Sequence, residues 1–342
     1  MRRPPFLLTA VLAAVLGLAG TAGLAGCSST GGLRAEQAAR SAASGGGGSG
    51  VSTPRWTFAM VTHAGSGDSF WDTVRKGAQQ AAAKDNVNFV YSNDANTANQ
   101  VQLVQAAIDQ KVDGLLVTLA KGDAMKAVLA KAEAAGIPVI TVNSGEEFSA
   151  KFGALAHVGQ DEATAGRAAG AELKQRGRKS VLCVIHEQGN VGQEQRCNGA
   201  KAAFGGAWQV LYVNGTDLPD ARAAIAAKLQ ADRSVDTVLT LSAPLANAAL
   251  QSVADAGRAA GSTEEDTFDL SSQVVAGLES GSIGFAVDQQ PYLQGYEGVD
   301  LLWLYKYNLN VLGGGSPVAT GPQILTRKDA PALAGYVGRG TR

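Results

Sequence analysis

The stretch TFAMVTHAGSGDSFWDTVRKGAQQAAA, residues 57–83, decides the fold. Its first six letters are mostly apolar or β-branched, which favours a buried strand. Its last letters place alanine and valine at three- and four-residue spacing, which favours an amphipathic helix. Glycines and short polar side chains lie between and indicate a loop. The stretch therefore predicts strand, loop and helix in series, the unit from which parallel sheets are built.

The same unit recurs along the chain. Short apolar or β-branched runs alternate with helical patterns, such as those over residues 72–84, 97–110 and 123–135. The runs are TFAMVT, VNFVYS, DGLLVTL, IPVITVN, ALAHVG, SVLCVI, WQVLYV, DTVLTL and IGFAVD. This alternation predicts an α/β protein with parallel sheets whose faces are covered by helices.

The loop of the first unit contains GDSF, residues 67–70, which is similar to a signature of serine hydrolases. A serine hydroxyl needs an adjacent general base to act as a nucleophile. The chain has three histidines, His63, His157 and His186, and none lies in the late position that such an esterase uses. An exported esterase with Ser69 as nucleophile is one alternative, and the other is that Ser69 starts the helix.

The N-terminus predicts export. Two arginines, an apolar run and small residues follow one another, the order of a secretory signal. Leu24–Cys27 resembles the lipobox of bacterial lipoproteins, so we expect a lipoprotein signal peptide over residues 1–26 and lipid on Cys27. Residues 27–54, rich in serine and glycine, predict a flexible tether. The mature protein is expected at the cell membrane, lipid-anchored and facing the extracytoplasmic side.

Composition limits the remaining chain. About 290 residues follow the tether, which is enough for a sizeable core and suits two domains better than one. The formal net charge is −1, and basic residues form no block. A nucleic-acid partner is therefore not expected, and a DNA-binding helix-turn-helix has no room before Trp56.

Two cysteines remain once Cys27 is assigned to lipid. Cys183 and Cys197 would pair as a disulfide in an exported, oxidising setting. A zinc site with His186 is an alternative, but it lacks a fourth ligand. Two buried free thiols are the other alternative.

Polar side chains gather just after the strands, where α/β folds bind their ligands. The segments are His63–Trp71, Asn143–Ser144, His186–Arg196, Asp269 and Asp288–Gln290. They contain amides, carboxylates, one arginine and two adjacent aromatics, and they contain no assembled catalytic set. These segments therefore favour a binding site over an active site.

Three motifs now carry a resemblance. GDSFWDTVRKGAQQAA (67–82), GIPVITVNSG (136–145) and VDQQPYLQGYEGVDLL (287–302) resemble type I periplasmic solute-binding proteins of the ribose-binding family, the sugar receptors of ABC importers. The resemblance implies two similar doubly wound parallel-sheet α/β domains joined by a hinge of three crossovers. It places the crossovers near Gln160–Asp161, Gln289–Gln290 and Pro317–Gly321. The implied lobes are 55–160 plus 290–318 and 161–289 plus 319–342.

The resemblance also implies which side chains bind the ligand: His63, Asp68, Phe70, Trp71, Asn143, Arg196, Asp269 and Gln289. Their chemistry suits a sugar, whose apolar C–H face needs an aromatic plate and whose hydroxyls need planar hydrogen-bonding groups. Phe70 and Trp71 would supply the plate. No catalytic residue, metal or cofactor is expected.

The match to the ribose binders is incomplete at two places. Ser242–Pro244 stands where they carry an Asn-Asp pair, and Asn143–Ser144 replaces an Asp-Arg pair, so ribose itself is not the expected ligand. Purely structural roles are the alternative to ligand binding for several of these residues. Phe70 and Trp71 could be core residues, and Asp269 could cap a helix. His186, Glu187 and Asp288 could line the cleft or end a strand.

These expectations combine into one function. The chain should be a monomeric, membrane-tethered receptor that encloses a sugar or polyol between two lobes and delivers it to the permease subunits of an ABC importer. A receptor that passes the same ligand signal to a membrane signalling protein is the alternative within the same class. The exported esterase is the alternative from another class.

Overall fold

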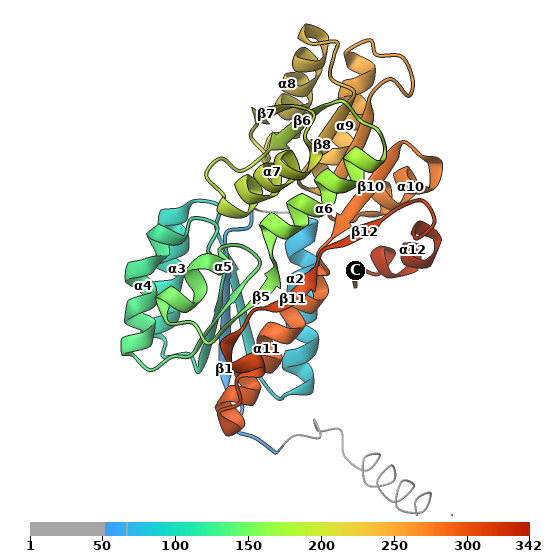
Figure 1. The fold of residues 1–342 in the computed structure, drawn as a ribbon. Helices are drawn as coiled ribbons and strands as arrows, with labels where there is room; N and C mark the ends of the chain where they lie inside the picture. Colours follow the sequence, from blue (N-terminus) through green and yellow to red (C-terminus); the bar gives the residue numbers. More distant parts are fainter. Residues whose placement is uncertain (1–51, 66–67) are drawn as a thin grey trace, which may run out of the picture. The chain divides into compact units, whose positions relative to one another are not determined.

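The strands form two separate six-stranded sheets in the computed structural model, which describes residues 52–65 and 68–342 (Figure 1). Every apolar run singled out in the sequence contributes a strand. All neighbouring strands pair in parallel except the last edge pair of the second sheet. The predicted fold class, two doubly wound α/β domains with parallel sheets, is confirmed.

The first sheet and its helices form the first lobe. In spatial order its strands are β11 (Val318–Gly321), β5 (Ala156–Gln160), β4 (Val139–Val142), β3 (Gly114–Val117), β1 (Thr57–Thr62) and β2 (Asn88–Asn93). Its helices are α2 (Ser69–Lys84), α3 (Thr97–Asp109), α4 (Gly122–Ala134), α5 (Glu146–Ser149), η1 (Ala150–Phe152), α11 (Pro291–Asn308) and η2 (Leu312–Gly315). Helices α2 and α11 bury apolar side chains against one face, and α3 and α4 do so against the other.

The second lobe repeats this plan. Its strands, in spatial order, are β12 (Gln323–Leu325), β10 (Ile283–Asp288), β9 (Glu264–Phe268), β8 (Thr237–Thr240), β6 (Ser180–Ile185) and β7 (Ala207–Tyr212). Its helices are α6 (Glu162–Gln175), α7 (Val191–Phe204), α8 (Leu218–Ala231), α9 (Ala243–Asp255), α10 (Ser272–Ser280) and α12 (Ala330–Gly338). Helices α6 and α7 cover one face, and the other four cover the opposite face.

The chain passes between the lobes three times. The first passage lies between β5 and α6, and the second between β10 and α11. The third is Pro322, which alone separates β11 from β12. The lobe boundary expected between residues 318 and 319 falls inside β11. Because β11 pairs with β5 from Val318 to its last residue, Gly321, with one irregularity, it belongs to the first lobe, and the change of lobe comes at Pro322.

Three strands lie outside the nine apolar runs of the sequence, although the end of one of them was expected directly before Asp269. Strand β9 begins with Glu264, Glu265 and Asp266, so its charged letters hide a segment that is nonetheless buried after its first residue. Strands β11 and β12 have four and three residues, too short for a visible pattern. Tertiary pairing, and not local pattern, defines all three.

The expectations about the N-terminus fall almost wholly outside the described residues. These are the signal peptide over 1–26, lipid on Cys27 and most of the tether over 27–54. At the end of that tether, Thr53 already contacts the first lobe, since its carbonyl accepts a hydrogen bond from Asn86 Nδ2 at 3.1 Å. Within residues 52–65 and 68–342, no helix is long and apolar enough to cross a membrane.

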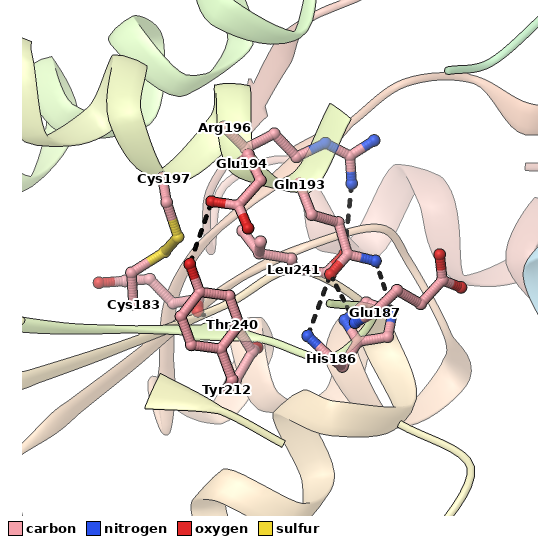
Figure 2. The surroundings of a disulfide bond; sticks show 11 residues. Cys183, His186, Glu187, Gln193, Glu194, Arg196, Cys197, Tyr212, Thr240 and Leu241 are labelled. Atoms are coloured by element: carbon pink, nitrogen blue, oxygen red, sulfur yellow. Dashed lines mark hydrogen bonds between the residues drawn. A yellow bond between two sulfur atoms is a disulfide. The ribbon is translucent and has the colours of Figure 1, made fainter. Parts of the chain in front are cut away.

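A disulfide fastens α7 to β6. Cys183 and Cys197 are bonded, with their Cα atoms 6.1 Å apart, and both side chains are buried (Figure 2). The predicted pairing is confirmed. It rules out the zinc interpretation, because both sulfurs are used by the bond.

Loss of this bond should destabilise the second lobe. A disulfide that closes a loop of about 15 residues is worth about 3 kcal/mol in the chain-entropy model. We therefore expect reduction to lower the free energy of unfolding by about that amount in denaturant titrations. A Cys183→Ala/Cys197→Ala variant should start at the lower value and not respond to reductant. Unlinked Cys183 and Cys197 peptides in a non-reduced digest would contradict the expectation.

Candidate functional site

The loops that follow the strands of both sheets meet around one small cavity of about 40 Å³. All eight side chains expected to bind ligand line it: His63, Asp68, Phe70, Trp71, Asn143, Arg196, Asp269 and Gln289. The cavity has room for a few water molecules only. It adjoins a larger hollow of about 660 Å³ that shares His63, Asp68 and Glu187 with it. The residues expected from the sequence to lie together are therefore close together in the fold.

Aromatic rings form one wall of the cavity. The Trp71 ring meets the His63 ring and the Phe70 ring edge-on, each at a centroid distance of 5.1 Å. Trp71 is 5% exposed and packs into the same apolar cluster as Phe58 and Met60. The two interpretations of Trp71 thus coexist, since the indole belongs both to the core of the first lobe and to the cavity wall.

Two aspartates face the cavity from opposite lobes. Asp68 caps α2 by accepting a hydrogen bond from the Phe70 N–H at 2.9 Å. Asp269 follows β9 in a left-handed conformation, φ 68°, and accepts from Gln289 Nε2 at 2.6 Å. Burial raises the pKa of Asp68 to about 6 and that of Asp269 to about 7. Both carboxyls are therefore acceptors whose charge is incompletely satisfied inside the protein.

A buried amide network crosses the second passage. Asn143, after β4, donates from Nδ2 to Gln289 Oε1 at 3.1 Å and to Gln294 Oε1 at 3.3 Å. Gln294 in turn donates to Gln289 Oε1 at 3.1 Å. Ser144 Oγ donates to Asn143 Oδ1 at 2.8 Å. Since each buried amide finds partners, the network sets the orientation of Asn143 and Gln289 at the cavity.

Arg196 is held by a residue that the sequence analysis did not name. Its guanidinium donates to both carboxylate oxygens of Glu162, at 2.6 and 2.7 Å, and to the Leu241 carbonyl at 3.3 Å. It also lies 4.8 Å from the centre of the Phe268 ring. Burial opposes the charge of Arg196, but the Glu162 carboxylate keeps its pKa above the ordinary value. The arginine therefore enters the site as half of a buried ion pair.

Two histidines near the cavity are neutral bases. His63 Nδ1 pairs with Thr118 Oγ1 at 2.8 Å, and its Nε2 lies 3.5 Å from both Glu187 Oε2 and Asn190 Nδ2 of the second lobe. Burial lowers the pKa of His63 and takes that of His186 to about 4. His63 therefore bridges the lobes without carrying a charge at neutral pH.

Further contacts join the two lobes at the rim. The Val191 N–H donates to the Ala120 carbonyl at 3.0 Å, and Gln195 Nε2 donates to Glu147 Oε1 at 2.9 Å. These contacts explain why the cavity is small, because the loops around it touch.

The structure also shows which of the remaining polar residues line the cavity. His186 and Glu187 line the cavity, and so does Ser242, at the position that departs from the ribose binders. Figure 2 shows His186 and Glu187 beside Gln193, which holds their backbone N–H groups through its side-chain oxygen. Asp288 does not line the cavity, because it is buried against Arg342, with Nε to Oδ2 at 2.6 Å.

Some lining residues gave little signal in the sequence. Asn190 and Gln193 lie in the segment after β6 but were not singled out. Asn190 caps α7 by accepting from the Gly192 N–H at 3.0 Å, so a cap position after a strand was the available signal. Leu241 has no such signal, because an apolar letter at a strand end does not show that its carbonyl faces a cavity.

The esterase alternative finds no geometric support. Ser69 is the first residue of α2, directly after the cap Asp68, and it is not among the cavity-lining residues. In the described part of the chain, no hydrogen bond joins the Ser69 hydroxyl to a histidine. Over the same residues, no group of three or more histidine, cysteine or acidic side chains could hold a metal ion. What the cavity offers is an aromatic wall, three carboxylates and several amides.

Comparison with known proteins agrees with this architecture. A family model described as a periplasmic binding protein domain matches residues 58–307. A carbohydrate transporter from Acidothermus cellulolyticus, solved in complex with myo-inositol, is 48% identical, with a TM-score of 0.82 over 84% of this chain and 100% of that one.

More distant relatives also match the chain. A solute-binding protein from Agrobacterium vitis, bound with alpha-D-tagatopyranose, is 25% identical, with a TM-score of 0.72 over 83% of this chain and 99% of that one. The xylose/arabinose-binding protein XylF of Sulfolobus acidocaldarius is 22% identical over 272 residues, which are 74% of this chain and 66% of that protein.

Proposed function

The chain belongs to the periplasmic binding protein family, and from this premise we propose that it captures a neutral sugar or polyol between its two lobes. The observation that carries the proposal is the cavity itself. It combines an aromatic wall from the first lobe with carboxylate acceptors and amides from both lobes. Such a mixture suits a ring with apolar faces and a rim of hydroxyls.

A cyclic polyol such as myo-inositol is the first candidate within this class. The relative at 48% identity was solved with myo-inositol. A cyclitol offers only hydroxyls, each of which can donate to a carboxylate such as Asp68 or Asp269 and accept from an amide such as Gln289, whose Nε2 makes one hydrogen bond, to Asp269. The uncharged Asn143–Ser144 pair suits a ligand that carries no charge itself.

Capture requires the lobes to move. The inner cavity holds only a few water molecules, so a ring enters when the contacts of His63, Asn190 and Gln195 across the rim separate. The three short passages can absorb the change of backbone angles while each core stays packed. We propose that the ligand-bound, closed form is then delivered to the permease subunits of an ABC importer. In this proposal the protein is a lipid-anchored monomer outside the cytoplasm, and it binds its ligand without changing it chemically.

A thermal-shift screen tests the function. Neutral pentoses, hexoses and cyclitols should raise the melting temperature, because a ligand that binds only the folded state stabilises it. Calorimetry on the best compound should give a Kd on the order of micromolar or tighter, equivalent to about 8 kcal/mol or more. Stabilisation by amino acids or phosphates alone would refute the proposal.

Trp71→Leu should weaken binding by about 5- to 150-fold, since loss of the indole face removes about 1 to 3 kcal/mol of contact. Because Trp71 also belongs to the core, the melting temperature should fall as well. The matched control is Trp303→Leu, which alters a partly buried tryptophan packed against the same cluster outside the cavity. The control should lose stability and keep its affinity. Equal affinities for the two variants in calorimetry would show that Trp71 acts in the core only.

Affinity should rise with pH through the range in which Asp269 and Asp68 ionise. Their pKa values are about 7 and about 6 in the unliganded protein. Hydroxyl donors favour the ionised carboxylates, so binding lowers both pKa values and releases protons. Affinity should therefore be lowest below about pH 5, increase by up to about tenfold per pH unit for each proton released, and level off above about pH 8.

Two variants separate this effect from other titrations. Asp269→Asn should bind more weakly and flatten the upper part of the profile, whereas Asp109→Asn, at an exposed position of α3, should leave the profile unchanged. A wild-type affinity that falls as pH rises from 5 to 8 would mean that protonated carboxyls donate to the ligand, contrary to this expectation.

A further inference from the structure

Glu162 lies where the chain first passes from one lobe to the other. Gln160 ends β5, Asp161 caps α6, and Glu162 is the first residue of that helix. Glutamate is rarely buried, yet this residue is 4% exposed. It is not among the residues that line the cavity. Its burial therefore has a cause other than direct contact with a bound molecule.

Close packing of α6 on α7 explains the burial. A Cβ atom on Gly166 would lie 2.3 Å from the Arg196 carbonyl oxygen, and one on Gly199 would lie 2.4 Å from the Ala163 carbonyl oxygen. Only glycine permits such a close approach of two helix backbones. The approach brings Glu162, at the start of α6, against the side chain of Arg196.

The Glu162 carboxylate contacts both lobes. Arg196 donates to it twice, from Nε at 2.6 Å and from Nη2 at 2.7 Å. Gln160 of the first lobe donates to the same carboxylate from Nε2 at 2.9 Å. Two parallel charge-assisted bonds fix the plane of the guanidinium and neutralise its charge.

We propose that Glu162 is a positioning and specificity residue, which orients Arg196 and cancels its charge so that the site accepts neutral polyols and rejects acidic sugars. This inference rests on the proposed function. The other charged groups at the inner cavity are the acids Asp68, Asp269 and Glu187. With the arginine neutralised, an anionic ligand meets repulsion without a compensating cation.

The test compares neutral and anionic ligands on matched variants. Kd values for myo-inositol and D-glucuronate are measured by calorimetry at pH 8 on the wild type, Glu162→Gln and Glu172→Gln. The amide of Glu162→Gln has nearly the shape of the carboxylate but leaves Arg196 charged. Glu172 is a control from the same helix, paired with Arg176 at 3.7 Å outside the cavity.

Glu162→Gln should weaken myo-inositol binding about tenfold or more, because the arginine loses its second fixed bond. The ratio of glucuronate to inositol affinity should increase at least about tenfold, because a buried positive charge now faces the ligand. Glu172→Gln should match the wild type in both. A purely structural role would lower both affinities by one factor and leave the ratio unchanged, which would overturn the proposal.

A second variant covers the case in which Glu162→Gln does not fold. Glu162→Gln/Arg196→Gln leaves no unpaired charge, so it should fold, bind inositol more weakly and keep the wild-type ratio. A ratio that shifts towards glucuronate in this double variant would contradict the proposal. The two hypotheses fail in different ways. A folded wild type that binds no neutral sugar or polyol refutes the proposed function. If the wild type binds inositol and the Glu162→Gln variant has the same affinities, only the role of Glu162 is refuted.

Discussion

Parallel strands all end at the same edge of their sheet, and the site depends on this constraint. The loops after β1 and β4 in the first lobe, and after β6, β8, β9 and β10 in the second, come to one cavity because each sheet gathers them at one edge. Residues as distant in sequence as His63 and Gln289 thereby line the same cavity. Since neither sheet supplies all of the groups, a ligand that uses the whole cavity must contact both lobes.

Burial of polar groups is the energetic cost of this arrangement, and the hydrogen-bond network offsets it. Asn143, Gln289 and Gln294 satisfy one another, and Arg196 is paired with Glu162. Asp269 has one strong donor, Gln289. Its pKa is raised because this hydrogen bond does not compensate for the loss of water around the carboxylate. Hydroxyl donors from a bound polyol would complete its shell. The site is thus built around acceptors that water or ligand must satisfy.

Much of this could be predicted from the sequence because its signals are local. Buried strands such as SVLCVI are visible in the sequence as apolar runs. The polar residues directly after them indicate the edge of the sheet at which the cavity lies. Glu162 could not be found in that way, since it begins a helix and looks like an ordinary first-turn acid. Its role depends on two glycines, Gly166 and Gly199, which matter only once α6 and α7 are known to touch. Strand β9 could be predicted only at its end, directly before Asp269, because its charged letters are buried by neighbours that the local pattern does not reveal.

The difference from the ribose binders has a physical consequence for ligand choice. Where those proteins have an Asp-Arg pair after the fourth strand, this chain has Asn143 and Ser144, bonded to each other at 2.8 Å. The remaining arginine of the cavity is neutralised by Glu162, so no cation of the inner cavity is left without an acidic partner among the described residues. In the proposed function, recognition would then depend on hydroxyl groups that donate to Asp68 and Asp269 and accept from amides. A ring that bears hydroxyls around its whole rim can donate to acceptors on both lobes at once, whereas a ligand with hydroxyls on one edge only would leave the carboxyl of one lobe without a donor. The number and placement of hydroxyls, more than ring size, should therefore decide which polyol the closed site retains.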